Sequence, residues 1–539
     1  MFSRLRWGVP RPSPLILRHG IFRSGGFRPG IFRPAVLGPA LAALLAAAGA
    51  ALPISAPAAD WRFSLRFSPQ VHQAPYSGRV YLFFSEQRRQ PRRDLDWFHP
   101  EEFIAKDVKG WKPGETLELA GGDKQILAYP SRAAIDNLPD CRAQAVVRFN
   151  PFERQIGEGP GNGYSQVVVI KHSANENPPQ TFVVDRLVAS PRFIETPFRK
   201  ELTVRSKLLS EFFGREVRLA AAVVLPPGYD SGETRRYPAI LTVSGFGGSH
   251  YPGPNDPLFP EATRKGVDFI RVALDANCPT GHHVFADSAN NGPVGQALVT
   301  EFLPALDRAF RTVADPRARF LTGHSSGGWS TLWLQIAYPE TFGGTWSTSP
   351  DPVDFRDFQG IDLYRPGENL YFDHSGRPRS LARLGGKVVL TFPRFARMED
   401  VLGTGGQLHS FEAVFSPRGA GGRPQPLWDT ETGAIHADIA KSWGRYDIRL
   451  VLERNWKELG PKLAGKIHVF TGSEDTFYLD GAARLLKKSL AGLGSDAVVE
   501  IVPDKSHFDL LGPVLFRRIR REMAEAFLKA FPARHPARS

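Results

Sequence analysis

Cysteine is scarce in this chain, with Cys141 and Cys278 the only two among 539 residues. Two cysteines cannot form the dense disulfide network of a small secreted scaffold. They could pair in an oxidising compartment, although the sequence favours two separate buried thiols. Clusters of His, Cys and Asp with metal-ligand spacing are also missing, since the adjacent His282 and His283 lack that geometry. We therefore expect no catalytic metal and no cofactor.

Acidic residues are absent from the first 59 positions, which hold seven arginines followed by an apolar stretch at 35–52 and small residues at 56–59. A basic segment, an apolar core and an Ala-x-Ala-like end are typical of a secretory signal peptide. We expect residues 1–59 to be removed and the mature protein to be secreted or periplasmic, without stable membrane insertion. A retained anchor is the alternative, although Pro39 and Pro53 interrupt the apolar stretch.

Clustered basic residues are missing as well. The net charge of +13 falls to +6 without the first 59 residues, and the remaining Lys and Arg are scattered. This pattern indicates a solvated surface and argues against nucleic-acid binding. The 42% hydrophobic and 23% charged content is ordinary for a globular protein, and the length predicts two or three domains. The oligomeric state is left open.

Residues 60–205 carry short stretches of strand-like sequence. The stretch 61–67 alternates apolar and polar residues with period two, as a half-buried strand does. Gly, Pro, Asn and Asp separate it from further strand-like runs at 79–84, 143–149 and 166–170. Short strands at this spacing predict a small all-β, sandwich-like domain.

Residues 206–539 show a second pattern, in which strands alternate with helices. Such alternation predicts a mostly parallel sheet with helices on both faces. The expected strands are 217–225, 239–243, 269–274, 319–322, 344–347, 466–472 and 497–502, and the expected helices are 295–310, 327–337, 481–490 and 513–530. An insertion at 351–465, rich in Gly, Pro, Arg and Trp, is long enough to form a lid or a binding surface.

The stretch Gly323-His324-Ser325-Ser326-Gly327 lies between an expected strand and an expected helix. Strand, Gly-x-Ser-x-Gly and helix in that order predict a nucleophile elbow. The glycines are needed because the sharp turn strains the serine and leaves no room for flanking side chains. We expect Ser325 to be the nucleophile, with its hydroxyl clear of the sheet edge.

A serine nucleophile needs a base and a carboxylate, which follow it along the chain in this type of site. His507 lies in the loop after the last expected strand and is the expected base, since imidazole exchanges protons near neutral pH. Asp475, in the loop after the preceding strand, is the expected carboxylate. The alternatives for the carboxylate are Glu474, Asp351 and Asp354.

Two backbone amides must bind the oxyanion. The loop Ser244-Gly245-Phe246-Gly247-Gly248 follows the expected strand 239–243. It corresponds to the His-Gly-x-Gly loop of esterases, with serine in place of the usual histidine. We expect the amides of Phe246 and Ser326 to be the two donors.

Together these segments resemble the esterase D-like family of α/β-hydrolases. The similarity spans about 208–531 and includes Val224-Leu225-Pro226-Pro227-Gly228-Tyr229, the elbow, Ser349-Pro350 and Gly472-x-x-Asp475. It departs from the family at Ser244 and in the enlarged insertion. Members act on formylglutathione, feruloyl and acetyl-sugar, siderophore and mycolyl esters, so the resemblance implies ester chemistry better than it implies a substrate.

The sequence therefore predicts a serine carboxylic-ester hydrolase that works through an acyl-enzyme on a small-molecule or carbohydrate-linked ester. Acyl transfer and a prolyl-oligopeptidase-like peptidase are the alternative reactions. The 60–205 segment is too short for the propeller that usually accompanies such a peptidase. A non-catalytic binding protein on a hydrolase fold is the alternative from another class.

Overall fold

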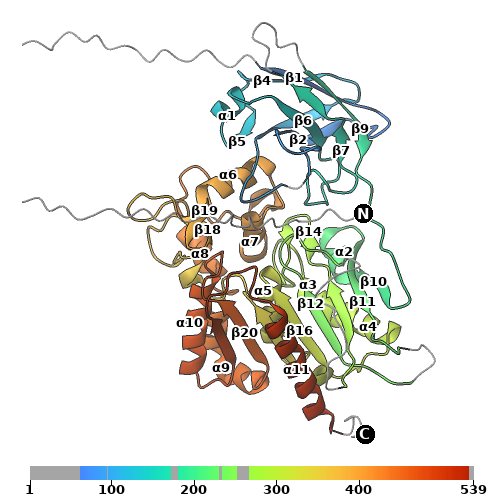
Figure 1. The fold of residues 1–539 in the computed structure, drawn as a ribbon, viewed down its shortest axis with the longest axis vertical. Helices are drawn as coiled ribbons and strands as arrows, with labels where there is room; N and C mark the ends of the chain where they lie inside the picture. The colour runs from blue at the N-terminus through green and yellow to red at the C-terminus, as the bar shows by residue number, and fades with distance from the viewer. Residues whose placement is uncertain (1–60, 94, 172–179, 230–233, 252–265, 533–539) are drawn as a thin grey trace, which may run out of the picture. The chain divides into compact units, whose positions relative to one another are not determined.

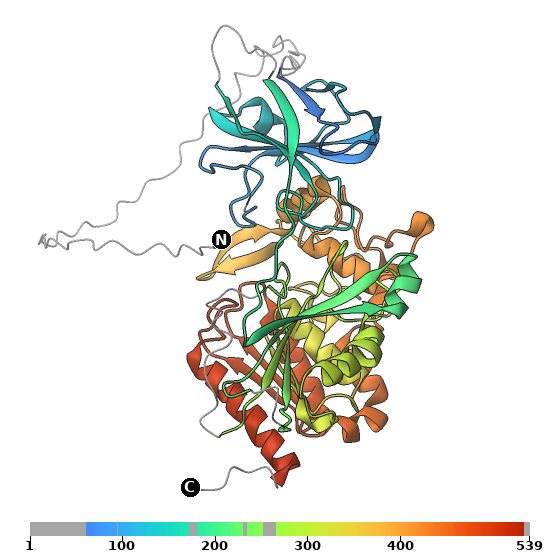
Figure 2. The same ribbon diagram turned by 90° about the vertical axis from the view of Figure 1, so that its right-hand side faces the viewer.

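The computed structural model describes residues 61–93, 95–171, 180–229, 234–251, 266–532. The expected signal peptide lies outside these residues. From Trp61 onward the described chain forms one structural unit with two large sheets (Figures 1 and 2). Within the described ranges, no helix is long and apolar enough to cross a membrane.

The first sheet has nine strands in the order β4-β1-β9-β7-β6-β2-β3-β5, with β8 also paired to β6. Most neighbours are antiparallel, whereas β1 and β9 are parallel. The elements are β1 (Arg62–Phe67), β2 (Tyr76–Ser85), β3 (Phe103–Trp111), β4 (Leu117–Ala120), β5 (Leu127–Tyr129), α1 (Arg132–Asp136), β6 (Cys141–Val147), β7 (Gly163–Ser165), β8 (Val168–Ile170) and β9 (Gln180–Leu187).

Strand β2 shows why this sheet is apolar on both faces. Val80, Leu82 and Phe84 point into a core formed by the first sheet alone. Tyr81 and Phe83 point the other way, into a core shared with residues 353–463. Because successive side chains of a strand alternate between faces, a strand buried on both sides has a continuous apolar run. The first sheet is thus packed against the insertion.

The second sheet has eight strands in the order β10-β11-β13-β12-β16-β17-β20-β21. Its first two strand pairs are antiparallel and the others are parallel. The strands are β10 (Arg199–Ser206), β11 (Val217–Val224), β12 (Ala239–Val243), β13 (Ile270–Leu274), β16 (Arg319–His324), β17 (Gly344–Thr348), β20 (Ile467–Gly472) and β21 (Val498–Val502). The mostly parallel sheet with flanking helices confirms the α/β-hydrolase fold.

Helices cover both faces of the second sheet (Figure 1). Ile240, Phe320 and Phe470 pack with α11 (Pro513–Ala530) on one face. On the other face, Leu241 and Leu321 lie in a second core and Val469 lies in a third. The helices of these two cores are α3 (Val294–Ala297), α4 (Leu303–Ala309), α5 (Ser326–Ala337), α9 (Ile448–Leu463) and α10 (Leu479–Gly492). The central strands are therefore buried on both faces. Their carboxyl ends are held in fixed positions, and the loops that follow them start from this edge of the sheet.

The helix expected at 295–310 is divided into α3, the π-helical turn η1 (Leu298–Phe302) and α4. Pro304 explains part of this difference, because it has no N–H to donate to the turn before it. The remaining helices are α2 (Lys207–Phe213) and the 3-10 turn η2 (Pro316–Ala318), and a short hairpin pairs β14 (Asn277–Cys278) with β15 (Gly281–His282).

The insertion expected at 351–465 is folded. It contains η3 (Phe355–Asp357), the hairpin of β18 (Ser380–Leu384) and β19 (Lys387–Thr391), α6 (Phe392–Leu402), α7 (Gln407–Phe415), η4 (Ala420–Gly422), α8 (Ala437–Trp443) and α9. Trp428 and Trp443 are 2% and 0% exposed in its core. Its stability thus derives from its own apolar side chains as well as from the sheet beneath it.

Candidate active site

Ser325 lies in a strained turn between β16 and α5. Its backbone angles are φ 59° and ψ −127°, which a non-glycine residue rarely adopts. The turn is held by hydrogen bonds from the Ser325 amide to the Thr348 carbonyl and from the Trp329 amide to the Ser325 carbonyl, each 3.0 Å long. The side chain is partly exposed. This is the geometry of a nucleophile elbow.

The elbow glycines allow close backbone packing. A Cβ atom at Gly323 would lie 2.2 Å from the carbonyl oxygen of Gly327, and one at Gly327 would lie 2.0 Å from that of Val243. Both distances are far shorter than any real contact. The turn therefore admits glycine alone at these two positions, as the sequence predicts.

His507 and Asp475 meet at the carboxyl edge of the second sheet. The Nδ1 atom of His507 is 3.0 Å from Oδ2 of Asp475, and the two side chains are 4% and 0% exposed. The other carboxylate oxygen of Asp475 accepts from the amide of Phe477 at 2.9 Å. The imidazole ring of His507 is 4.5 Å from that of His324, the residue before Ser325. Base, carboxylate and elbow thus converge on one edge.

Burial alone would raise the pKa of the Asp475 carboxyl, but the facing charge of His507 and hydrogen bonds to His507 and Phe477 lower it below its ordinary value. The carboxylate is therefore ionised at neutral pH. An ionised partner at Nδ1 keeps the proton of a neutral imidazole on that nitrogen, which leaves Nε2 as the basic atom.

The three alternative carboxylates have other hydrogen-bond and ion-pair partners. The side chain of Glu474 is 56% exposed and is 3.8 Å from Arg383. Asp354 is fully buried and paired with Arg356 and Arg449. Asp351 accepts a hydrogen bond from the hydroxyl of Ser326 at 2.6 Å. None of these residues has a hydrogen bond to His507 within the described part of the chain.

The other histidines of the second half have different partners. His374 pairs with Glu368, and His409 pairs with Asp400 and Glu412. His468 stacks on Trp346 with ring centroids 4.4 Å apart, as expected for a core histidine. Burial, with repulsion from His507, lowers the pKa of His324 to about 3, so this residue is neutral beside the site.

The oxyanion loop (Ser244–Gly248) lies directly against the nucleophile. A Cβ atom at Gly245 would be 3.1 Å from Cβ of Ser325. The loop closes through a hydrogen bond of 3.0 Å from the amide of Gly248 to the carbonyl of Gly245. Ser326 is the first residue of α5, and the first amides of a helix have no partner within it. The arrangement is compatible with the amides of Phe246 and Ser326 as oxyanion donors.

His282 is hydrogen-bonded to the oxyanion loop, a contact that the sequence did not predict. Its Nδ1 accepts from the amide of Val284 at 3.2 Å, so Nε2 carries the proton and donates to the carbonyl of Ser244 at 3.0 Å. Burial and the neighbouring His283 lower the pKa of His282 to about 3. The support is therefore a neutral hydrogen bond across the working pH range.

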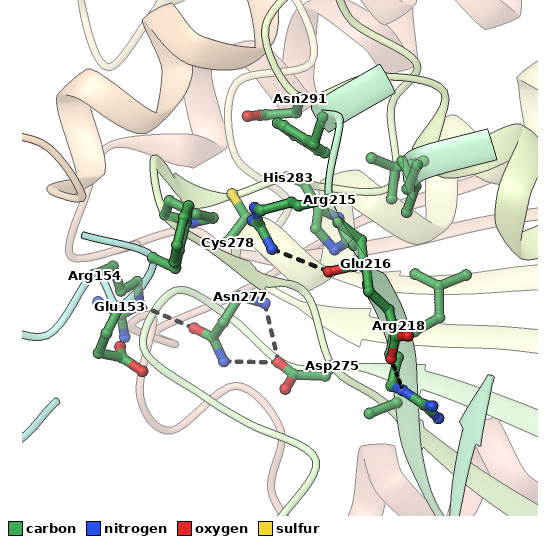
Figure 3. Close-up of a pocket in the computed structure, with 18 residues that line it drawn as sticks. Glu153, Arg154, Arg215, Glu216, Arg218, Asp275, Asn277, Cys278, His283 and Asn291 are labelled. Atoms are coloured by element: carbon green, nitrogen blue, oxygen red, sulfur yellow. Dashed lines mark hydrogen bonds and ion pairs between the residues drawn. The ribbon is translucent and has the colours of Figure 1, made fainter. Parts of the chain in front are cut away.

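A cavity of about 420 Å³ is lined by residues that include Arg154, Asn277 and His283 (Figure 3). On one side of it, Arg154 from the first-sheet region donates to Oδ1 of Asn277 at 2.9 Å, and Asn277 donates to the Gly248 carbonyl at 2.6 Å. On the other side, Arg215 bonds to the Glu216 carbonyl. Ser325, Asp475 and His507 are not among the residues that line this cavity. It is thus a neighbour of the site and not the reaction chamber.

The two cysteines are both free thiols, Cys141 in β6 and Cys278 in β14. Burial raises the pKa of each thiol, to about 11 for Cys141. In the part of the chain that the structure describes, no group of three His, Cys, Asp or Glu side chains could hold a metal ion.

Comparison with known proteins identifies an esterase family for this chain. Residues 210–488 match a family described as "Putative esterase". A curated protein of Xylanibacter ruminicola, "Endo-1,4-beta-xylanase/feruloyl esterase", is 28% identical over 138 residues, which are 23% of this chain and 18% of the relative's length. Its matched segment thus spans less than a fifth of that relative.

Two solved structures show low overall similarity to the chain. A "ferulic acid esterase" has a TM-score of 0.37 and 15% identity over 61% of this chain and 99% of its own. An S-formylglutathione hydrolase from Agrobacterium tumefaciens has a TM-score of 0.36 and 13% identity over 62% of this chain and 98% of its own.

Proposed function

Because the chain belongs to the esterase family whose model matches residues 210–488, we propose that it is a serine carboxylic-ester hydrolase with Ser325, His507 and Asp475 as its triad. The observation that carries the proposal is the 3.0 Å hydrogen bond between His507 and Asp475 at the sheet edge where the elbow presents Ser325. Asp475 lies in the loop after β20, His507 in the loop after β21, and Ser325 in the turn after β16.

In the proposed reaction, Ser325 Oγ attacks the ester carbonyl carbon while its proton moves to Nε2 of His507. The carbonyl oxygen becomes an oxyanion that accepts hydrogen bonds from the amides of Phe246 and Ser326. His507 then gives the proton to the leaving alcohol as the carbon–oxygen bond breaks, and an acyl-enzyme remains. Water, deprotonated by His507, attacks this ester and releases the acid and free Ser325.

The substrate class proposed is a small-molecule or carbohydrate-linked ester. The curated relative of the chain carries feruloyl esterase in its name, which supports an ester of an aromatic acid with a sugar as the first substrate to test. Partitioning of the acyl-enzyme between water and an added sugar would reveal acyl transfer. The basic and apolar first 59 residues support secretion, which sequencing the N-terminus of the exported protein would check.

The proposal is tested by Ser325→Ala with p-nitrophenyl acetate and with a fluorophosphonate probe. The variant should lose turnover by at least about 10³-fold and should not react with the probe, since it lacks the hydroxyl that would form the acyl-enzyme. Ser375→Ala removes an exposed serine of the insertion and should behave as the wild type. Turnover that survives in a folded Ser325→Ala variant would refute the assignment.

A further inference from the structure

Two aromatic residues of the β domain (the first sheet and its connecting loops, residues 61–187) reach the proposed active site. Trp97 and Phe98 lie in the loop between β2 and β3. The ring of Trp97 is 5.6 Å from that of Phe246 in the oxyanion loop and 5.0 Å from that of Phe395 in α6. Phe98 is 6.2 Å from Phe477 and 6.3 Å from Phe508. One loop of the β domain thus contacts three loops that carry catalytic groups.

The partners of Phe98 are also the neighbours of the catalytic pair. Phe477 follows Asp475 by two residues, and its ring stands edge-on to His507 at 4.9 Å. Phe508 follows His507 directly, and their ring centroids are 5.4 Å apart. Phe508 is 46% exposed. Phe508 therefore presents a solvent-exposed ring beside the base that must protonate the leaving alcohol, whereas Phe98 is 8% exposed and packs against Phe477 and Phe508.

The partners of Trp97 lie on the oxyanion side. Trp97 and Phe246 are both only partly buried, whereas Phe395 is 1% exposed and anchors the Trp97 ring from behind. Accessible faces of aromatic rings stack favourably on other flat rings and gain from burial. Partly exposed rings at a reactive centre are a typical lining of a ligand site.

A second residue of the β domain supports the same oxyanion loop independently. The guanidinium of Arg154 lies 4.6 Å from the ring centroid of Phe246, and its hydrogen bond to Asn277 is relayed to the Gly248 carbonyl. Phe246 is thus contacted by Trp97 and Arg154 from separate loops of one domain. These two contacts indicate that the β domain packs directly against the oxyanion loop and forms part of the site.

We propose that the β domain forms one wall of the substrate-binding site, in which Trp97 holds a planar ring of the ester and the buried Phe98 positions Phe477 and Phe508. The inference rests on the proposed esterase function and extends it, since it assigns substrate recognition to a domain outside the hydrolase fold. It requires an ester with a ring in its acyl or alcohol part, because the aromatic surface extends from the oxyanion loop to the leaving-group side.

The test compares Trp97→Ala with the wild-type full-length chain on three esters, assayed by proton release. Phenyl acetate carries a ring on the alcohol, methyl benzoate carries one on the acyl group, and ethyl acetate has none. The ratio of kcat/KM for a ring ester to that for ethyl acetate cancels general damage to the catalytic groups. This ratio should fall about tenfold for at least one ring ester, because the variant cannot stack on the ring of the substrate or bury it. Most of the change should appear as a higher KM.

Three further variants separate recognition from folding. Trp97→Leu keeps an apolar side chain without the ring. Its ratio of kcat/KM values should fall as much as that of Trp97→Ala, and it replaces the alanine variant in the test if that variant is unstable. Trp97→Phe should restore most of the ratio. Trp61→Ala removes a partly buried tryptophan of the same domain that contacts Phe63 and Asp136, and it should leave the ratio unchanged.

The inference is overturned if both ring esters keep their wild-type ratios in a folded Trp97→Ala or Trp97→Leu variant. It is also overturned if Trp61→Ala lowers the ratio equally, because the loss would then reflect general destabilisation of the β domain. A failure of the proposed function would look different, since the wild type would then hydrolyse none of the three esters.

Discussion

The amide nitrogen Nε2 of Gln407 donates a hydrogen bond of 3.3 Å to the hydroxyl of Ser326, the residue after the proposed nucleophile. The Ser326 hydroxyl in turn donates its single proton to Asp351 at 2.6 Å. It can therefore only accept from Gln407, so the N–H side of the Gln407 amide faces Ser326. The helix α7 of the insertion thus contacts the residue whose backbone amide is an expected oxyanion donor.

Replacing Gln407 with Leu should lower kcat/KM about three- to tenfold, the net worth of one hydrogen bond, because Ser326 loses a group that fixes its position. Steady-state kinetics with p-nitrophenyl acetate measures the effect. The matched control is Gln70→Leu, which changes an exposed glutamine of the β domain and should have wild-type kinetics. Equal kinetics for the two variants would show that the insertion does not tune the elbow.

Asp351 makes stability depend on pH. Burial raises the pKa of its carboxyl to about 6, with the hydroxyls of Ser326 and Ser325 and the charge of His507 acting in the opposite direction. In the unfolded chain the carboxyl has its ordinary pKa of 3.8. Between these two values the unfolded state loses its proton first, so folding is penalised increasingly as pH rises to 6, and the penalty is constant above that.

The Asp351→Asn variant should therefore gain stability relative to the wild type as pH rises from 4 to 8, by about 2.5 kcal/mol at 1.36 kcal/mol for each pKa unit. Asparagine retains a carbonyl oxygen that can accept from Ser326. Urea unfolding at both pH values measures the difference. A stability difference between the two proteins that does not change with pH would contradict the raised pKa.

The Asp475→Asn variant tests the role of the orienting carboxylate. An asparagine can present an N–H to Nδ1 of His507, which moves the imidazole proton to Nε2 and removes the base that Ser325 needs. The expected result is a drop in kcat of about 10²–10⁴-fold with KM little changed. Glu474→Gln is the control, because this exposed neighbour was the alternative carboxylate. A larger loss in the control would transfer the role to Glu474.

The sequence marks the parts of the candidate site that are local. Ser325 is marked by its own flanking residues, and the expected strand 239–243 coincides with β12. His507 and Asp475 follow from chain order, because loops after neighbouring parallel strands meet at one edge. Asp351 was named as an alternative carboxylate, but the structure places it against Ser326.

The residues that sequence reasoning missed come from distant segments. Trp97, Arg154 and Gln407 belong to the β domain and the insertion, and no motif marks them. Their contacts depend on how separate cores pack together, which local propensity and periodicity do not encode. A run apolar on both faces, such as that in β2, was the one available signal that something packs on the outer face of the first sheet.

The last prediction concerns the backbone of the elbow. A Cβ atom at Gly323 would lie 2.2 Å from the Gly327 carbonyl oxygen and 2.9 Å from that of Val243, and neither backbone group can move without displacing the sheet or α5. Gly323→Ala should therefore cost more than about 3 kcal/mol of unfolding free energy or remove activity by displacing Ser325.

The matched control is Gly492→Ala at the end of α10, where a Cβ atom would have no neighbour within 4 Å. That change should leave activity intact and should stabilise the protein by about 0.5–1 kcal/mol, because alanine loses less backbone entropy than glycine in a helix. Urea unfolding and p-nitrophenyl acetate turnover of both variants give the comparison. If Gly323→Ala retained wild-type stability and activity, the close packing of the elbow against β12 would be wrong, and with it the placement of Ser325.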